Sequence, residues 1–174
     1  IRNSGVLYIG GDVTIGELNG NPSYTGIYSR DGGVLDIDGR TNIYSVRNAL
    51  ESRDTTVANF QGGVSLLSQQ LATISIQDKA KITLRHLEKA EGPTFLNITG
   101  GALTVKKMDD IRVTENAINY LGGQVNIDGG VLSANNGQVI SQQGNVIDIG
   151  NVDIVGSNTL IVNKLSSVVA TMGS

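Results

Sequence analysis

The sequence predicts an all-β protein, a right-handed parallel β-helix (solenoid) of about seven coils, each with about 22 residues and three short strands. Two columns of apolar residues recur at this period and drift together along the chain. The composition agrees, because 23 glycines, two prolines and no tryptophan suit many short strands joined by tight corners.

The first column consists of pairs of apolar residues two positions apart, as expected for one face of a strand. From Ile15 to Ile149 the pairs are separated by 22, 23, 24, 21, 22 and 22 residues. We expect their side chains to stack inside the coil. The pairs are Val13 and Ile15, Leu35 and Ile37, Ala58 and Phe60, Ile82 and Leu84, Leu103 and Val105, Val125 and Ile127, and Ile147 and Ile149.

A second strand lies about ten residues upstream of each pair and shows steps of 23, 24, 21, 22, 22 and 22 residues. A third apolar cluster, with less regular phase, completes each coil. The second column is Ile27, Leu50, Ile74, Phe95, Ala117, Val139 and Ile161, and the third is Leu18, Ile43, Leu66, Leu87, Ile111, Leu132 and Ile154.

Another register aligns the double glycines along the chain, but it needs long insertions in two coils. Placing Thr55-Thr56 and Lys79-Ala80 at the same turn removes these insertions. The turn then also holds Arg30-Asp31, Arg53-Asp54 and Gln77-Asp78, and it becomes glycine-rich in later coils.

A polar column follows the second strand, two residues after each of its apolar positions. Ser and Asn at a turn can hydrogen-bond the next coil and satisfy backbone groups that the bend leaves unpaired. We therefore predict a structural ladder, interrupted at Ile76. Its members are Ser29, Ser52, Asn97, Asn119, Ser141 and Asn163.

The whole chain, residues 1–174, reads as a single β-helix domain with no change in composition along it. The repeat begins and stops abruptly, and a bare coil end exposes unpaired strand edges. We therefore expect a fragment of a longer solenoid or fibre.

The stacked columns, the Ser/Asn ladder and stretches such as Gly-Ile-Tyr-Ser-Arg-Asp-Gly-Gly-Val-Leu-Asp-Ile-Asp-Gly at 26–39 resemble the pectin-lyase-like superfamily. Within it, the chain is similar in style to bacteriophage tailspikes and tail fibres and to bacterial autotransporter passengers. This resemblance implies an extracellular location, on a virion or a bacterial cell surface. It is specific for fold and weak for activity.

Composition argues against several other classes of function. The net charge is −3, and the Lys and Arg residues are scattered, whereas nucleic-acid binding needs a basic stripe. No apolar run approaches the ~20 residues of a membrane span. Cysteine is absent and His86 is the single histidine, so we predict no metal site and no cofactor.

The outward positions of the second strand are apolar in the last four coils. A stripe of this kind on a protein surface usually marks a contact. We interpret it as a self-association face, because parallel β-helical virion spikes are commonly trimers. A missing flanking segment, a covering loop or a ligand groove are the alternatives. The predicted interface residues are Leu96, Ile118, Ile140 and Val162.

An enzyme of this fold needs carboxylates, as a glycosidase pair about 5 to 9.5 Å apart or as calcium ligands. Asp12, Asp36 and Asp38 are the candidates on the outward face of the first strand. The predicted register places Asp12 and Asp36 on neighbouring coils, roughly 8 Å apart.

Two classes of function follow. The first is a non-enzymatic structural segment of an extracellular fibre, most like a phage tail fibre or tailspike used in host attachment, or alternatively an autotransporter adhesin. Outward residues that could meet a cell-surface glycan are Tyr28, Arg30, Asp36, Tyr44 and Arg53. The second is a polysaccharide-degrading enzyme, a lyase or a glycosidase, that acts through the three aspartates.

Overall fold

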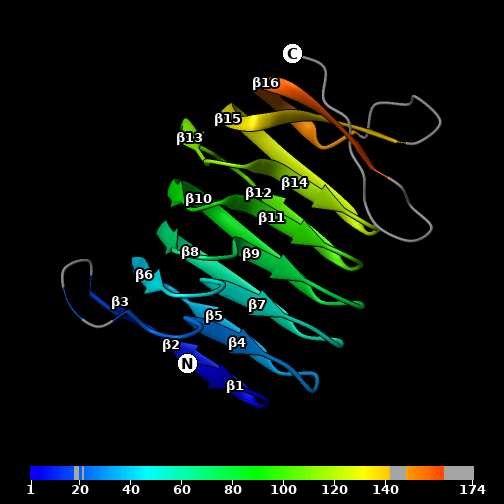
Figure 1. Ribbon diagram of the computed structural model, residues 1–174. Coiled ribbons are helices and arrows are strands. Elements are labelled where there is room, and N and C mark those ends of the chain that lie inside the picture. The colour runs from blue at the N-terminus through cyan, green and yellow to red at the C-terminus, as the bar shows by residue number, and fades with distance from the viewer. Residues whose placement is uncertain (18–19, 21, 142–147, 163–174) are drawn as a thin grey trace.

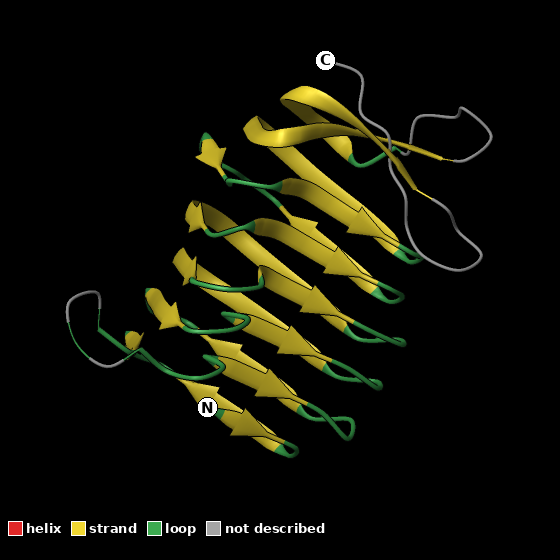
Figure 2. Cartoon of the chain, viewed as in Figure 1, coloured by secondary structure: helices red, strands yellow, loops and turns green. Residues whose placement is uncertain are grey.

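A computed structural model describes residues 1–17, 20, 22–141 and 148–162, and it shows a parallel β-solenoid of about six turns (Figure 1). The predicted fold class is confirmed, and the number of turns is close to the seven expected. The described part contains strands and loops but no helix (Figure 2).

The sixteen strands form one continuous sheet that winds around the core. Several strands bend around a corner without a break, so β8, β10 and β15 each cover more than one face. The strands are β1 (Arg2–Asn3), β2 (Val6–Ile9), β3 (Val13–Ile15), β4 (Ile27–Ser29), β5 (Val34–Ile37), β6 (Thr41–Ser45), β7 (Leu50–Ser52), β8 (Val57–Ser68), β9 (Ala72–Ile76), β10 (Lys81–Glu91), β11 (Thr94–Ile98), β12 (Ala102–Val105), β13 (Ile111–Arg112), β14 (Asn116–Tyr120), β15 (Gln124–Ser141) and β16 (Gly150–Val162).

Each turn of the solenoid, here called a rung, passes through three faces. Face A consists of β1, β4, β7, β9, β11 and β14. Face B consists of β2, β5, β12 and the first parts of β8, β10 and β15. Face C consists of β3, β6, β13, the later parts of β8, β10 and β15, and part of β16. All pairings between strands are parallel, as the repeat predicts.

The inner side of face B carries the predicted stack of apolar side chains. Ile37 pairs with Phe60, and Phe60 pairs with Leu84 on the next rung. All three side chains are at most 1 % exposed. Rungs of a parallel sheet lie ~4.8 Å apart, so each side chain packs directly on its neighbours.

The first rung differs from the prediction. Leu7 and Ile9 of β2, not Val13 and Ile15, pair with Leu35 and Ile37. Val13 and Ile15 belong to face C, where they pair with Thr41 and Ile43. Both pairs of residues alternate like a strand, but the connection that follows β3 lengthens this turn to 28 residues between paired positions, so a constant period selects the wrong pair.

The second apolar column shifts by one residue between its third and fourth members. Ile74 pairs with Leu96, not with Phe95, and Leu96 pairs with Ile118. Phe95 and Leu96 are both fully buried and both belong to the core. The alternation of inward and outward side chains fails here because the chain enters face A at a corner, where two successive side chains can point inward.

The third column is confirmed only in part. Ile43 pairs with Leu66, and Ile111, Leu132 and Ile154 pair in succession. Leu87 pairs with Val64 and bridges to Met108, and Ala90 takes the position beside Leu66. Leu18 and Ile147 lie outside the described residues. The last pair is also shifted, because Ile127 pairs with Gly150 and not with Ile149.

The corner between faces A and B repeats one backbone conformation on successive rungs. Asp31, Asp54 and Asp78 have positive φ angles of 56°, 62° and 59°, a region that Asp tolerates better than most residues. Their carboxylates also link the rungs, because the amide of Asp31 donates to Asp54 Oδ2 at 2.8 Å and that of Asp54 donates to Asp78 Oδ2 at 3.1 Å. The placement of this turn in the sequence is therefore confirmed.

Replacing Leu84 with Ala tests the core stack. We expect the free energy of unfolding to fall by about 2 to 5 kcal/mol, because the change leaves a cavity between Phe60 and Val105 that the rigid rungs cannot close. Thr83→Ala, one residue away on the outer side, is the control and should cost less than about 1 kcal/mol. Chemical denaturation followed by circular dichroism measures both, and equal losses would contradict the inward stacking.

Candidate functional site

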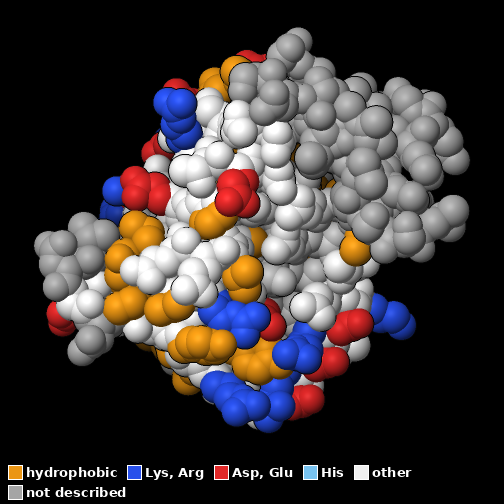
Figure 3. Space-filling model, in the orientation of Figure 1, with side chains coloured by type: hydrophobic (Ala, Val, Ile, Leu, Met, Phe, Trp, Pro, Cys, Tyr) orange, Lys and Arg blue, Asp and Glu red, His pale blue; other side chains and the backbone are white. Residues whose placement is uncertain are grey.

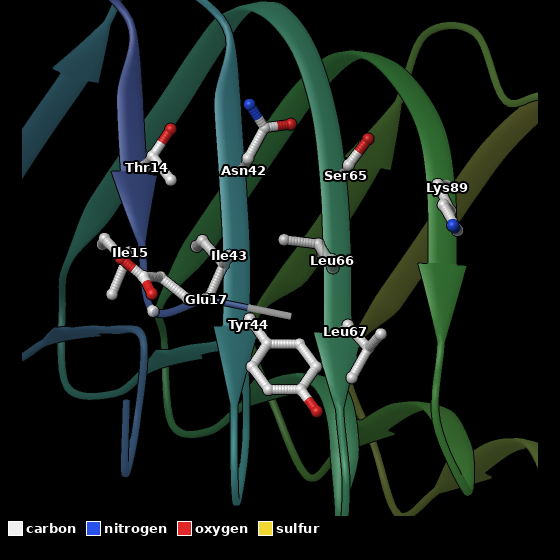
Figure 4. A pocket seen from close by; sticks show the side chains of 11 residues that line it. Thr14, Ile15, Glu17, Asn42, Ile43, Tyr44, Ser65, Leu66, Leu67 and Lys89 are labelled. Carbon is white, nitrogen blue, oxygen red and sulfur yellow. The ribbon is translucent and has the colours of Figure 1, made fainter. Parts of the chain in front are cut away.

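A groove of about 390 Å³ crosses the outer side of face C, over β3, β6, β8 and β10 (Figure 4). We call it the outer-face groove. Its lining comes from four successive rungs, which places residues far apart in the sequence side by side. The side chains around it include Thr14, Glu17, Asn42, Tyr44, Ser65, Leu67 and Lys89.

Strand alternation explains this lining. In β6 the burial alternates, so that Thr41, Ile43 and Ser45 point into the core while Asn42 and Tyr44 point outward. The paired register then places Asn42 beside Ser65, and Tyr44 beside Leu67. The groove therefore has a polar row and an apolar row, and both run across the strands.

Tyr44 is the aromatic side chain of the groove. Its ring lies beside Leu67 (Figure 4), and its hydroxyl accepts a hydrogen bond from Gln69 Nε2 at 2.9 Å. This hydrogen bond holds the ring in place. A fixed aromatic ring beside amide and hydroxyl groups can bind the apolar face of a sugar and hydrogen-bond its hydroxyl groups.

Charged groups stand at the two ends of the groove. Glu17 follows β3 at one end and Lys89 of β10 lies at the other. The ammonium of Lys89 is 3.2 Å from Glu91 Oε1. Because these charges lie on opposite sides of the groove and not together, the arrangement suits binding of a polar ligand and contains no pair of carboxylates.

A second, larger groove of about 790 Å³ continues along the same face of the solenoid toward the C-terminal rungs. β10 contributes to both, through Lys89 in the first groove and Glu91 in the second. The second groove is more polar, and its outward side chains include Glu91, Arg112, Thr114, Ser133 and Asn135.

A set of ion pairs, the charged clasp, lies near the corner between faces B and C. Arg40 pairs with Glu88, with Arg40 Nη2 at 3.1 Å from Glu88 Oε1. His86 Nε2 lies 2.9 Å from Asp109 Oδ1, and His86 Nδ1 lies 3.8 Å from Glu88 Oε1. The clasp links rungs that are not all in direct contact through their backbones.

Gly63 makes the clasp possible. Thr41 pairs with Val64, and His86 pairs with Gly63, so Gly63 sits on the rung between Arg40 and His86. A Cβ atom at Gly63 would lie 2.5 Å from Glu88 Oε1. The missing side chain therefore leaves the space through which Arg40 reaches Glu88.

The three candidate catalytic aspartates do not form the predicted arrangement. Tyr8, not Asp12, is the neighbour of Asp36 on the preceding rung. Asp12 precedes β3, and its Oδ1 accepts a hydrogen bond from the Arg40 amide at 2.8 Å. The predicted adjacency of Asp12 and Asp36 is wrong, for the same reason as the first-rung register. Asp12 and Asp38 are exposed and Asp36 is half-buried.

The predicted apolar stripe is also placed differently. Leu96 and Ile118 are at most 1 % exposed, so the expectation that they point outward is wrong. They take the inward positions because of the one-residue shift in the second column. The side chains of Ile140 and Val162 lie outside the described ones.

The predicted polar ladder consists of two separate parts. Ser29 and Ser52 pair with each other and are buried on the inner side of face A, and this column continues as Ile76. Asn97 and Asn119 form an outer column with Ser75, in which Asn119 Nδ2 donates to Asn97 Oδ1 at 2.7 Å. The side chain of Ser141 and the whole of Asn163 lie outside the described residues.

Of the predicted glycan contacts, the structure places Tyr44 in the outer-face groove and Asp36 on face B, so these two do not share a site. Sequence reasoning missed Thr14, Asn42, Ser65 and Leu67. Their signal is the alternation on either side of Ile15, Ile43 and Leu66, which the irregular phase of the third column hides.

Metal and membrane sites were also searched in the described part of the chain. Among residues 1–17, 20, 22–141 and 148–162, no three His, Asp or Glu side chains are arranged to hold a metal ion. The same residues contain no helix that is long and apolar enough to cross a membrane.

Comparison with known proteins gives no match: no family model fits the chain, and neither a curated protein nor a solved structure is significantly similar to it. The resemblance to the pectin-lyase-like superfamily is therefore supported at the level of the parallel β-solenoid alone.

Gly63→Ala tests the geometry of the clasp. The hydrogen bond from Arg40 lowers the pKa of Glu88 below its ordinary value. This pair contributes stability above the ordinary glutamate pKa, and the contribution is lost as the pH falls through the lowered value. In Gly63→Ala the added methyl group displaces the Glu88 carboxylate, so we expect the pKa of Glu88 to rise toward its ordinary value.

NMR titration of the Glu88 carboxyl carbon measures this change. Gly5→Ala is the matched control, because a Cβ atom at Gly5 has nothing within 4 Å. An unchanged pKa of Glu88 in Gly63→Ala would show that Arg40 and Glu88 do not depend on the open space at Gly63.

Proposed function

We propose that the chain is a non-enzymatic structural and cell-surface-binding segment of an extracellular fibre, most like part of a phage tail fibre or tailspike. The observation that supports this best is the outer-face groove, which carries a fixed Tyr44 on an uninterrupted stack of parallel rungs. An autotransporter adhesin would use the same features.

Rigidity is the first part of the mechanism. Each rung is hydrogen-bonded to the next through its backbone, and the side chains inside are stacked from rung to rung. A solenoid of this kind bends little, because bending would open hydrogen bonds or create cavities in the core. Such a body can hold a binding surface at a fixed distance from an anchor.

Glycan binding is the second part. A sugar ring placed on Tyr44 and Leu67 would have the amide of Asn42 and the hydroxyl of Ser65 within the same groove. The floor is mainly apolar and the ends are charged, which suits a ligand with both apolar and hydroxyl-bearing surfaces. A cell-surface polysaccharide has this chemistry.

Tyr44→Ala tests this function. We expect the affinity for a glycan that the wild-type protein selects from a panel of capsular and lipopolysaccharide glycans to fall about tenfold, because loss of one ring contact costs about 1 kcal/mol or more. Tyr8→Ala is the control, since Tyr8 is 69 % exposed on face B and outside the groove. Isothermal titration calorimetry measures both affinities, and an equal effect of the two changes would contradict the groove as the site.

A reducing-end assay on the same glycans separates binding from degradation. The proposal predicts no release of reducing ends. Release by the wild-type protein that disappears in Asp36→Asn would instead favour a polysaccharide-degrading enzyme, and the non-enzymatic proposal would fail.

Self-association is proposed from the resemblance to virion spikes alone, because Leu96 and Ile118 no longer supply a surface for it. Sedimentation velocity at tens of micromolar tests it. A trimer is the expected result and would favour a virion fibre over an autotransporter passenger, whereas a monomer would contradict the predicted trimer.

A further inference from the structure

Two arginines enclose one tyrosine on the outer side of face A. The guanidinium carbon of Arg53 lies 4.8 Å from the centre of the Tyr28 ring, and that of Arg2 lies 5.7 Å from it. Both distances are within the range of cation–π attraction. The ring therefore holds two positive groups close together on the surface.

The register of the rungs brings these residues together. Arg2 of β1 pairs with Tyr28 of β4, and Tyr28 pairs with Glu51 of β7. Arg53 directly follows β7, and its amide donates to the Ser29 carbonyl at 3.1 Å, which places Arg53 beside Arg30 on the preceding rung. Three arginines from three successive rungs thus surround Tyr28.

The acidic groups nearby are already engaged. Glu51 accepts a hydrogen bond from Asn48 Nδ2 at 3.1 Å and lies 3.6 Å from Arg53 Nη2. Asp31 pairs with Arg30 at 3.1 Å. Asp54 accepts the hydrogen bond from the Asp31 amide described above. Figure 3 shows Lys and Arg side chains gathered at this end of the molecule, with Asp and Glu beside them.

Arg2 and Arg53 keep unused hydrogen-bond donors. Among the described residues, Arg2 has no carboxylate partner within 4 Å, and it is exposed. The Nε atom of Arg53 is buried and has no hydrogen-bond partner. A buried donor without a partner is costly, and a bound anion would satisfy it.

We propose that Arg2, Tyr28 and Arg53 form an anion site that binds a carboxylate, sulfate or phosphate group of an acidic glycan. Guanidinium groups suit this role because their planar donors match such anions in pairs. The site lies on face A, whereas the outer-face groove lies on face C. This inference rests on the proposed function, and it specifies an acidic polysaccharide as the class of ligand.

The double variant Arg2→Ala, Arg53→Ala tests the site, with sulfated maltohexaose as the probe and unsulfated maltohexaose as its neutral counterpart. We expect the wild-type protein to bind the sulfated sugar more tightly, and the double variant to lose at least about tenfold in affinity for it. Binding of the unsulfated sugar should not change. Arg85→Ala is the matched control, because Arg85 is exposed on β10 and lies away from Tyr28.

The conservative variant Arg2→Lys, Arg53→Lys separates charge from geometry. It keeps both positive charges but loses the planar donors, so we expect an affinity between those of the wild-type protein and the alanine variant. Thermal unfolding of each variant verifies that the fold is unchanged. An equal loss in Arg85→Ala, or no loss in the alanine variant, would overturn the proposed site.

Inorganic sulfate distinguishes a glycan site from a site for free anions. Tight binding of sulfate alone, with no further gain from the sugar chain, would overturn the glycan as its source. Tyr44→Ala separates this inference from the proposed function. If Tyr44→Ala binds every glycan normally and the double arginine variant does not bind the sulfated one, the groove fails and the anion site stands. The opposite pattern rejects the anion site alone.

Discussion

The parallel pairing of one rung with the next is the constraint on which the rest of this structure depends. It fixes which side chains share the core, as with Ile37, Phe60 and Leu84, and it also fixes which side chains share the surface. Tyr44 and Leu67 are 23 residues apart in sequence and become neighbours only through this pairing. Each surface feature of the protein is therefore a consequence of register.

The same constraint explains why the charged and aromatic groups occur in rows. Arg2, Tyr28 and Glu51 occupy one outward position on three rungs. Arg40, Gly63 and His86 occupy another, and there the absent side chain of Gly63 matters as much as the charges around it. A solenoid can thus build sites from residues that recur at its period, without any long loop.

The sequence predicted the fold class and much of the core register, because buried apolar residues recur wherever the chain passes through face B. The errors arose where geometry changes without a change in residue type. The corner before Leu96 buries two successive residues, Phe95 and Leu96, so alternation placed Leu96 on the wrong side. The long first turn made Val13 and Ile15 resemble Leu7 and Ile9. The outer-face groove could not be predicted, since it depends on the phase of face C.

The central claim is that successive rungs stack in the register described. Nuclear Overhauser effects between the Phe60 ring and the methyl groups of Ile37 and Leu84 test it most directly in the unmodified protein. The account predicts both effects, and none between Ile37 and Leu84, which are two rungs or roughly 10 Å apart. Contact between Ile37 and Ile15, or no contact of either methyl group with Phe60, would contradict it.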